Sequence, residues 1–180
     1  MNKRMVIRRR SEKNYSSSLP ISYHILTGQI KYNTIRAMKK SSVYKDLTLL
    51  GSFIKQYPGK PSREILETFP NKYPENKFLV EFSQIGEFTS ICPVTGQPDF
   101  ADIIIKYIPA EKLIEAKSLK IYLMAYRKEE DFGEFIANRI MEDIWYVCKP
   151  LWIEVTASFK PRGGIGWKTV TSKGKETIMP

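Results

Sequence analysis

The sequence predicts an α+β fold in which an antiparallel sheet carries two helices on one face. Apolar and polar residues alternate at 78–82 and 151–159, which is the pattern of half-buried strands. Segment 100–108 is rich in β-branched residues, as strands are. Two segments with helical character lie between the second and third strands. The order strand, strand, helix, helix, strand is typical of α+β domains.

The first two strands flank a turn-rich stretch. The strand at 78–82 puts three apolar side chains on one face, and the strand at 100–108 ends at Pro109. Between them, Gly86 to Pro98 is predicted to be mostly turn. Residues 46–75 hold several prolines and are predicted to be mostly loop, with a short helical segment near their middle.

The two helices differ in how clearly they are marked. Lys117–Tyr126 is apolar and lacks glycine and proline, which indicates a well-buried helix. Residues 135–148 carry an apolar stripe at spacings of three and four, ended by Pro150. The stripe consists of Ile136, Ile140, Ile144, Val147 and Cys148. A turn at Pro161–Gly164 closes the third strand, and a further strand is predicted at 165–170.

Charge divides the chain into two regions. Segment 1–45 holds 11 of the 29 basic residues and 1 of the 19 acidic residues. The rest of the chain therefore holds 18 basic residues (29 − 11) and 18 acidic residues (19 − 1), and is neutral overall. We therefore expect a basic, partly flexible N-terminal extension at 1–45 and a folded domain at 46–180. Such an extension could contact nucleic acid phosphates, and a solvated tail is the alternative.

Composition excludes several classes of protein. Apolar residues make up 42% and charged residues 27% of the 180 residues, as in folded globular domains. No run of 18 apolar residues and no secretory signal pattern occurs, so we expect a cytoplasmic protein without a membrane contact. Two cysteines and one histidine, His24, are too few for a disulfide framework or a usual zinc site, so no metal is expected.

Cys92 is the candidate nucleophile. It lies in the polar, turn-rich stretch, where we expect it to be exposed and reactive, although an inert loop residue is equally compatible with this pattern. Cys148 falls on the helical stripe and is expected to be a small buried apolar residue. Asp99, seven residues after Cys92, could fold back beside the thiol as a general acid or base.

Four blocks of the sequence, in order, resemble the QueF family of NADPH-dependent 7-cyano-7-deazaguanine reductases. The resemblance covers roughly residues 47–165, and residues 1–45 lie outside it. The blocks are Glu87–Ala101, Glu115–Tyr122, Phe132–Glu134 and Pro161–Ile165.

The resemblance implies a tunnelling fold, in which sheets of several subunits join into a barrel with active sites between the subunits. It also implies the reaction. Cys92 would attack the nitrile of free 7-cyano-7-deazaguanine, and two hydrides from NADPH would reduce the thioimide to 7-aminomethyl-7-deazaguanine, an intermediate toward queuosine-type modified guanine in tRNA. A soft thiolate suits a nitrile carbon, and the covalent bond retains the half-reduced intermediate.

The resemblance also assigns site residues. Asp99 would be the general acid, and Glu134 would pair with the N–H edge of the deazaguanine ring, with Phe132 and Ser90 completing the substrate site. For Lys117 and Lys120 the alternative is a solvated lysine pair, and for Arg162 and Gly163 it is a plain turn that ends the strand. The residues implied to bind NADPH are Glu115, Lys117, Ser118, Lys120, Arg162 and Gly163.

One departure from the family stands out. The family triplet is Phe-His-Glu, whereas this chain has Gly133 in place of the histidine. An alternative is therefore a QueF-like amidine-forming enzyme, which adds ammonia to the thioimide of a nucleic-acid-borne base. The Glu115–Lys120 motif favours the reductase.

Two further classes are disfavoured. The retained Cys92, Asp99 and Glu134 argue against a binding protein without turnover, and the lack of histidine argues against a zinc cyclohydrolase.

Overall fold

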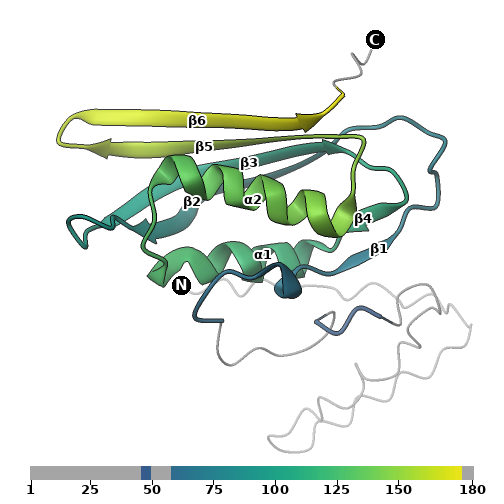
Figure 1. The fold of residues 1–180 in the computed structure, drawn as a ribbon, viewed down its shortest axis with the longest axis horizontal. Coiled ribbons are helices and arrows are strands. Elements are labelled where there is room, and N and C mark those ends of the chain that lie inside the picture. The colour runs from purple at the N-terminus through teal and green to yellow at the C-terminus, as the bar shows by residue number, and fades with distance from the viewer. Residues whose placement is uncertain (1–45, 50–57, 176–180) are drawn as a thin grey trace, which may run out of the picture. The chain divides into compact units, whose positions relative to one another are not determined.

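The computed structural model describes residues 46–49 and 58–175, so the predicted basic extension at 1–45 lies outside the described residues. The described part is built on a four-stranded antiparallel sheet with strand order β2-β3-β5-β6 (Figure 1). The strands are β2 (Val80–Ile91), β3 (Pro98–Ile108), β5 (Trp152–Arg162) and β6 (Ile165–Gly174).

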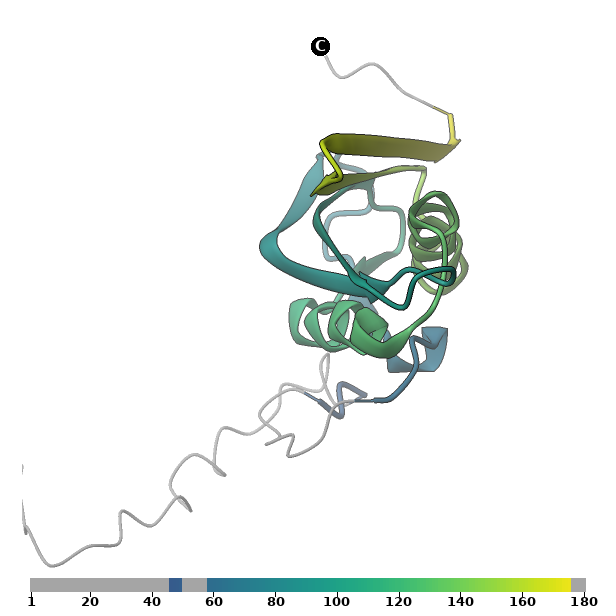
Figure 2. The ribbon, with the colours of Figure 1, turned by 90° about the vertical axis from the view of Figure 1, so that its left-hand side faces the viewer.

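Two helices lie on the same side of this sheet, as the two perpendicular views show (Figures 1 and 2). Helix α1 (Ala116–Met124) continues into the 3-10 helix η4 (Ala125–Lys128), and α2 is the longest helix (Gly133–Cys148). The predicted α+β class, with an antiparallel sheet and two helices on one face, is confirmed.

Alternate side chains of the strands and one face of α2 form the core. The α2 stripe is confirmed, because its three isoleucines are 0% exposed and Cys148 is 1% exposed. Each fully buried branched side chain contributes about 1.5–3 kcal/mol relative to an exposed one. The residues that meet at the centre of this layer are Ile103, Ile105, Tyr107, Ile136, Ile140, Ile144, Ile153 and Val155.

The prediction of turn at 86–98 was wrong for most of that stretch. β2 runs through to Ile91, and only residues 92–97 form the connection to β3. The strand continues because a bulge between Gln84 and Phe88 absorbs Gly86, whose backbone N–H donates to Asp102 Oδ1 at 2.8 Å. Cys92 therefore directly follows a strand.

The remaining elements are short. A 3-10 turn, η3 (Arg63–Ile65), precedes β1 (Thr68–Pro70), which pairs with β4 (Lys112–Ile114). The predicted strand at 165–170 is confirmed and extends to Gly174. Both residues of the β5–β6 turn, Gly163 and Gly164, have positive φ, 61° and 85°, as a tight hairpin turn requires.

Candidate active site

The β2–β3 hairpin brings Cys92 and Asp99 together. Ser90 faces Asp99 in the strand register, so the spacing of seven residues folds into one closed turn. Two backbone hydrogen bonds of 2.9 Å close this turn, from Cys92 N–H to Gln97 O and from Gly96 N–H to Cys92 O. The sulfur and the carboxyl group are thus carried by two adjacent strand ends.

Cys92 is buried, with 7% exposure, which corrects the expectation of an exposed thiol. Its pKa is nevertheless lowered to about 6, because the Thr95 side chain, the backbone N–H groups of Thr95 and Val94, and the Arg162 side chain all donate hydrogen bonds to the sulfur. Hydrogen bonds to the charged form favour ionisation, and here they outweigh the opposing effect of burial. The thiolate, which is the nucleophilic form, therefore predominates at neutral pH.

Arg162, near the end of β5, joins the thiol and the acid. Its Nη1 lies 2.8 Å from Asp99 Oδ1, and the same side chain donates to Cys92. Asp99 is 8% exposed. The sequence did not indicate that Arg162 contacts the nucleophile, nor that Thr95 does. A hydroxyl three residues after the cysteine in a turn was the available signal for Thr95.

The segment Glu129–Asp131 links the thiol to the predicted substrate residues. Ile91, next to Cys92, donates its N–H to Glu129 O at 2.9 Å and accepts from the Asp131 N–H at 3.2 Å. This pairing fixes the chain that leads directly into Phe132 and the start of α2. Phe132 is 48% exposed at the N-cap position of α2.

Glu134 and Ser90 lie in contrasting environments. Glu134 is exposed in the first turn of α2, where a carboxylate is favoured by the helix dipole. Ser90 is completely buried, and its hydroxyl oxygen has no hydrogen-bond partner among the described residues. The structure thus places Ser90, Asp99 and Cys92 on one hairpin, and the segment that pairs with Ile91 of this hairpin leads into Phe132 and Glu134.

Gly133 has a packing reason to be glycine. A Cβ at this position would lie 2.5 Å from Phe159 Cε2 and 3.0 Å from Trp167 Nε1. These two rings stack with their centroids 4.7 Å apart and an interplanar angle of 6°. The Phe159–Trp167 stack therefore occupies the space that a larger side chain at Gly133 would enter.

Three residues of the implied cofactor group bind the protein itself. Glu115 caps α1, accepting from the backbone N–H groups of Lys117 at 3.0 Å and Ser118 at 2.6 Å. The Ser118 hydroxyl donates to Glu115 O at 2.7 Å and accepts from the Glu67 N–H at 3.0 Å. The Lys117 ammonium donates to Leu49 O at 2.8 Å. These contacts anchor the first turn of α1 to the segment before it.

Lys120 is placed differently. It is exposed and lines a cleft of about 440 Å³ between α1 and strands β2 and β3. Apolar side chains form much of the wall, and Ser83, Gln84 and Glu87 also line it, so the cleft combines one cation, one carboxylate and an apolar surface. Gly163 is exposed in the β5–β6 turn, next to Arg162. The apolar wall residues are Phe82, Ile85, Ile103, Ile105, Leu119 and Leu123.

No helix within the described ranges, 46–49 and 58–175, is long and apolar enough to cross a membrane.

Comparison with known proteins identifies the family. The family model described as QueF-like protein matches residues 98–177. An NADPH-dependent 7-cyano-7-deazaguanine reductase of Neisseria gonorrhoeae is 49% identical over 129 residues, which is 72% of this chain and 82% of the relative. A reductase of the same name from Bacillus licheniformis is 47% identical over 137 residues, 76% of this chain and 82% of the relative.

A solved structure has the same fold. The crystal structure of the archaeosine synthase QueF-Like in the apo form matches with a TM-score of 0.50 and 23% identity, over 55% of this chain and 96% of that one. This likeness concerns the fold. The sequence identity with the reductases, sustained over more than four-fifths of their length, shows that the chain belongs to the QueF family.

Proposed function

We propose that this protein is an NADPH-dependent reductase that converts the nitrile of 7-cyano-7-deazaguanine into the amine of 7-aminomethyl-7-deazaguanine, on the way to queuosine-type modified guanine. Close relatives carry the name of this activity. The observation that carries the proposal is Cys92, a buried thiol with a pKa lowered to about 6 beside Asp99 and Arg162. A persistent thiolate is what addition to a nitrile requires.

The first step forms a covalent thioimide. The Cys92 thiolate forms a C–S bond with the nitrile carbon, and one π pair of the C≡N bond moves to nitrogen. Asp99, in its protonated carboxylic-acid form, donates a proton to that nitrogen and becomes the carboxylate that Arg162 pairs with, which prevents charge from accumulating on the nitrogen. Arg162 holds both groups, because it pairs with the Asp99 carboxylate and donates to the sulfur. Thr95 supplies a further donor to the thiolate.

The ring of the substrate is held by the start of α2. Glu134 accepts hydrogen bonds from the N–H edge of the ring, and Phe132 offers an exposed aromatic face for stacking. The Ser90 hydroxyl, buried beside Asp99, completes this site. Because Glu129–Asp131 is paired to Ile91, the ring and the thiolate are held by connected backbone.

The cleft lined by Lys120 is the candidate site for NADPH: Lys120 offers a cation for phosphate, the apolar walls suit a ring, and Ser83, Gln84 and the Glu87 carboxylate offer further polar groups. Each NADPH would supply one hydride when bound, so two molecules in succession would be needed to reach the amine, and cleavage of the C–S bond would return the Cys92 thiolate. Lys117 and Gly163 are further candidates for holding it. Glu115 and Ser118 act through the first turn of α1, because their polar atoms bind that turn.

The two edges of the sheet support a proposal for the assembly. β2 and β6 are the outer strands of the four-stranded sheet in the described part of the chain, and pairing between such edges would join subunits into the tunnelling-fold barrel. We propose a cytoplasmic homo-oligomer with active sites between subunits.

Nucleic acid contact by residues 1–45 is testable by comparing the salt-dependent binding of the full chain with that of a chain that begins at Asp46.

The test combines NADPH oxidation with mass spectrometry of the protein in the presence of 7-cyano-7-deazaguanine. Two NADPH consumed per nitrile, with a transient adduct on Cys92, would support the proposal. An adduct without NADPH oxidation would contradict it and favour amidine formation by ammonia. Cys92→Ala should lose both the adduct and turnover.

A further inference from the structure

The segment Glu129–Asp131, which we call the strap, is the stretch of chain between η4 and the start of α2. It pairs with the strand end that carries the nucleophile and leads into the residues proposed to bind the ring. Both backbone polar groups of Ile91 bond to it, at 2.9 Å to Glu129 O and 3.2 Å from the Asp131 N–H. A shift of the strap would therefore change the distance between Cys92 and the start of α2.

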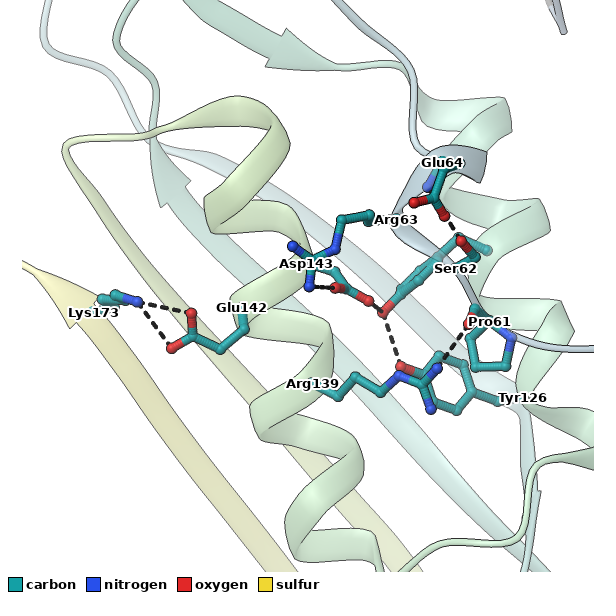
Figure 3. Close-up of polar contacts among 10 residues, drawn as sticks. Pro61, Ser62, Arg63, Glu64, Tyr126, Arg139, Glu142, Asp143 and Lys173 are labelled. Carbon is teal, nitrogen blue, oxygen red and sulfur yellow. Dashed lines mark hydrogen bonds and ion pairs between the residues drawn. The ribbon is translucent and has the colours of Figure 1, made fainter.

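Arg139 fastens the strap from the middle of α2. Its Nη1 donates to Glu129 Oε1 at 2.6 Å, and its Nη2 donates to Pro61 O at 2.8 Å. The guanidinium also lies 5.8 Å from the centre of the Tyr126 ring (Figure 3). One planar group thus ties the strap to the loop before η3 and to η4.

Tyr126, whose ring lies against Arg139, is itself held by a chain of hydrogen bonds. The Tyr126 hydroxyl lies 2.8 Å from the Tyr122 hydroxyl, and Tyr122 donates to Asp143 Oδ2 at 2.8 Å. Asp143 in turn pairs with Arg63 at 3.1 Å (Figure 3). These groups are mostly buried, so their hydrogen bonds restrict movement more than surface ion pairs do.

We propose that Arg139 is a positioning residue: by clamping Glu129 it holds the strap in the place where the Cys92 sulfur and the ring-binding residues meet the same substrate molecule. This inference rests on the proposed function. Covalent addition depends steeply on the placement of the reacting atoms, and a displacement of about 1 Å can cost about 100-fold in rate. Arg139 acts through Glu129, and the partners of its guanidinium, Glu129, Pro61 and Tyr126, do not include the reacting atoms.

The experiment compares two reactions of the same thiol in Arg139→Met. One is adduct formation with 7-cyano-7-deazaguanine, which needs alignment, and the other is alkylation by iodoacetamide, which needs only an accessible thiolate. We expect the first rate to fall about 10- to 100-fold and the second to change less than about twofold. The matched control is Lys173→Met, which breaks the exposed pair of Lys173 with Glu142 at 2.7 Å (Figure 3) and should leave both rates unchanged.

A second route keeps the proposal testable if Arg139→Met unfolds. Glu129→Gln retains the size of the side chain and removes its charge, so it should lower the adduct rate in the same direction. Combined with Arg139→Met, it should add little, since Arg139→Met has already removed the contact between Arg139 and Glu129. Arg139→Lys should restore only part of the rate, because one ammonium cannot reproduce the fork to Glu129 and Pro61.

The outcomes separate the two claims. Equal losses of adduct formation and alkylation, or no loss of either in Arg139→Met and Glu129→Gln, would overturn the positioning role. Absence of any adduct in the unmodified protein would instead overturn the proposed function, and the positioning role with it.

Discussion

The two cysteines of this chain are both buried, yet their environments shift their pKa values in opposite directions. Cys92 is 7% exposed and its pKa is lowered to about 6, whereas Cys148 is 1% exposed and burial raises its pKa to about 12. Cys92 receives hydrogen bonds from Thr95, Val94 and Arg162. Cys148 instead acts as a donor, to Lys112 O at 3.0 Å.

The difference shows that burial alone does not decide the reactivity of a thiol. At the end of α2 the sulfur is surrounded by apolar core, where a charge would be poorly solvated. In the β2–β3 turn, donors take the place of water around the charge. A loop that follows a strand can present several such donors at once, whereas the last turn of a helix presents carbonyl oxygens.

The strongest test of this contrast is removal of each sulfur. Cys92→Ala should abolish turnover and the covalent adduct, because no other group in the turn can form the thioimide. Cys148→Ala should keep full activity and lose about 1–2 kcal/mol of unfolding free energy, because it leaves a small cavity. Steady-state NADPH oxidation and thermal unfolding measure the two effects. Turnover surviving in Cys92→Ala would refute the covalent mechanism.

Arg162→Gln should have the next largest effect. It removes a donor to the thiolate and leaves the Asp99 carboxylate, 8% exposed, without its cation. We expect turnover to fall about 100-fold and the pKa of Cys92 to rise, since a positive group that favoured the thiolate is gone. A pH profile of alkylation with iodoacetamide gives the pKa. If only the affinity for NADPH changed, Arg162 would be a cofactor residue, as the family resemblance implies.

Gly133→Ala tests why the start of α2 differs from the family pattern. The added Cβ would sit 2.5 Å from the Phe159 ring, so either the ring or the helix start must move. Stability should fall by about 1–3 kcal/mol, and the affinity for the deazaguanine should drop with it. Thermal unfolding and calorimetric titration measure these quantities. Phe159→Leu in the same chain should relieve the clash, and a failure to do so would remove the packing explanation.

Local patterns in the sequence predicted most of the fold. Strands β3 and β5 and the α2 stripe follow from spacing within about a dozen residues, and the sequence predicted them. The short pair β1 and β4 was not predicted, because three-residue strands have no periodicity and form only when distant segments meet. β2 was predicted too short because glycine inside a bulge looks like a turn.

In the candidate site, too, local motifs predicted some residues, whereas contacts between distant segments were not predicted. Cys92, Asp99 and Glu134 were predicted from motifs, and the hairpin register brings the first two together. The contacts of Arg162 depend on β5 lying beside β3, which no local pattern reveals. The expectation that Cys92 is exposed failed because a polar loop can fold back on itself and bury a side chain among its own donors.

The smallest predicted effect isolates one donor. Thr95→Val keeps the shape of the side chain and removes its hydroxyl, which makes the largest contribution to the low pKa of Cys92. The thiolate forms as pH rises through about 6 in the unmodified protein, so reactivity should be nearly constant above neutrality. In Thr95→Val the midpoint should move upward, and alkylation at pH 7 should slow by up to about tenfold while approaching the original rate at higher pH. Cys148 should resist alkylation throughout in both proteins, because its pKa lies near 12. A slowing that persists equally at every pH would show that Thr95 affects access to the sulfur rather than its charge.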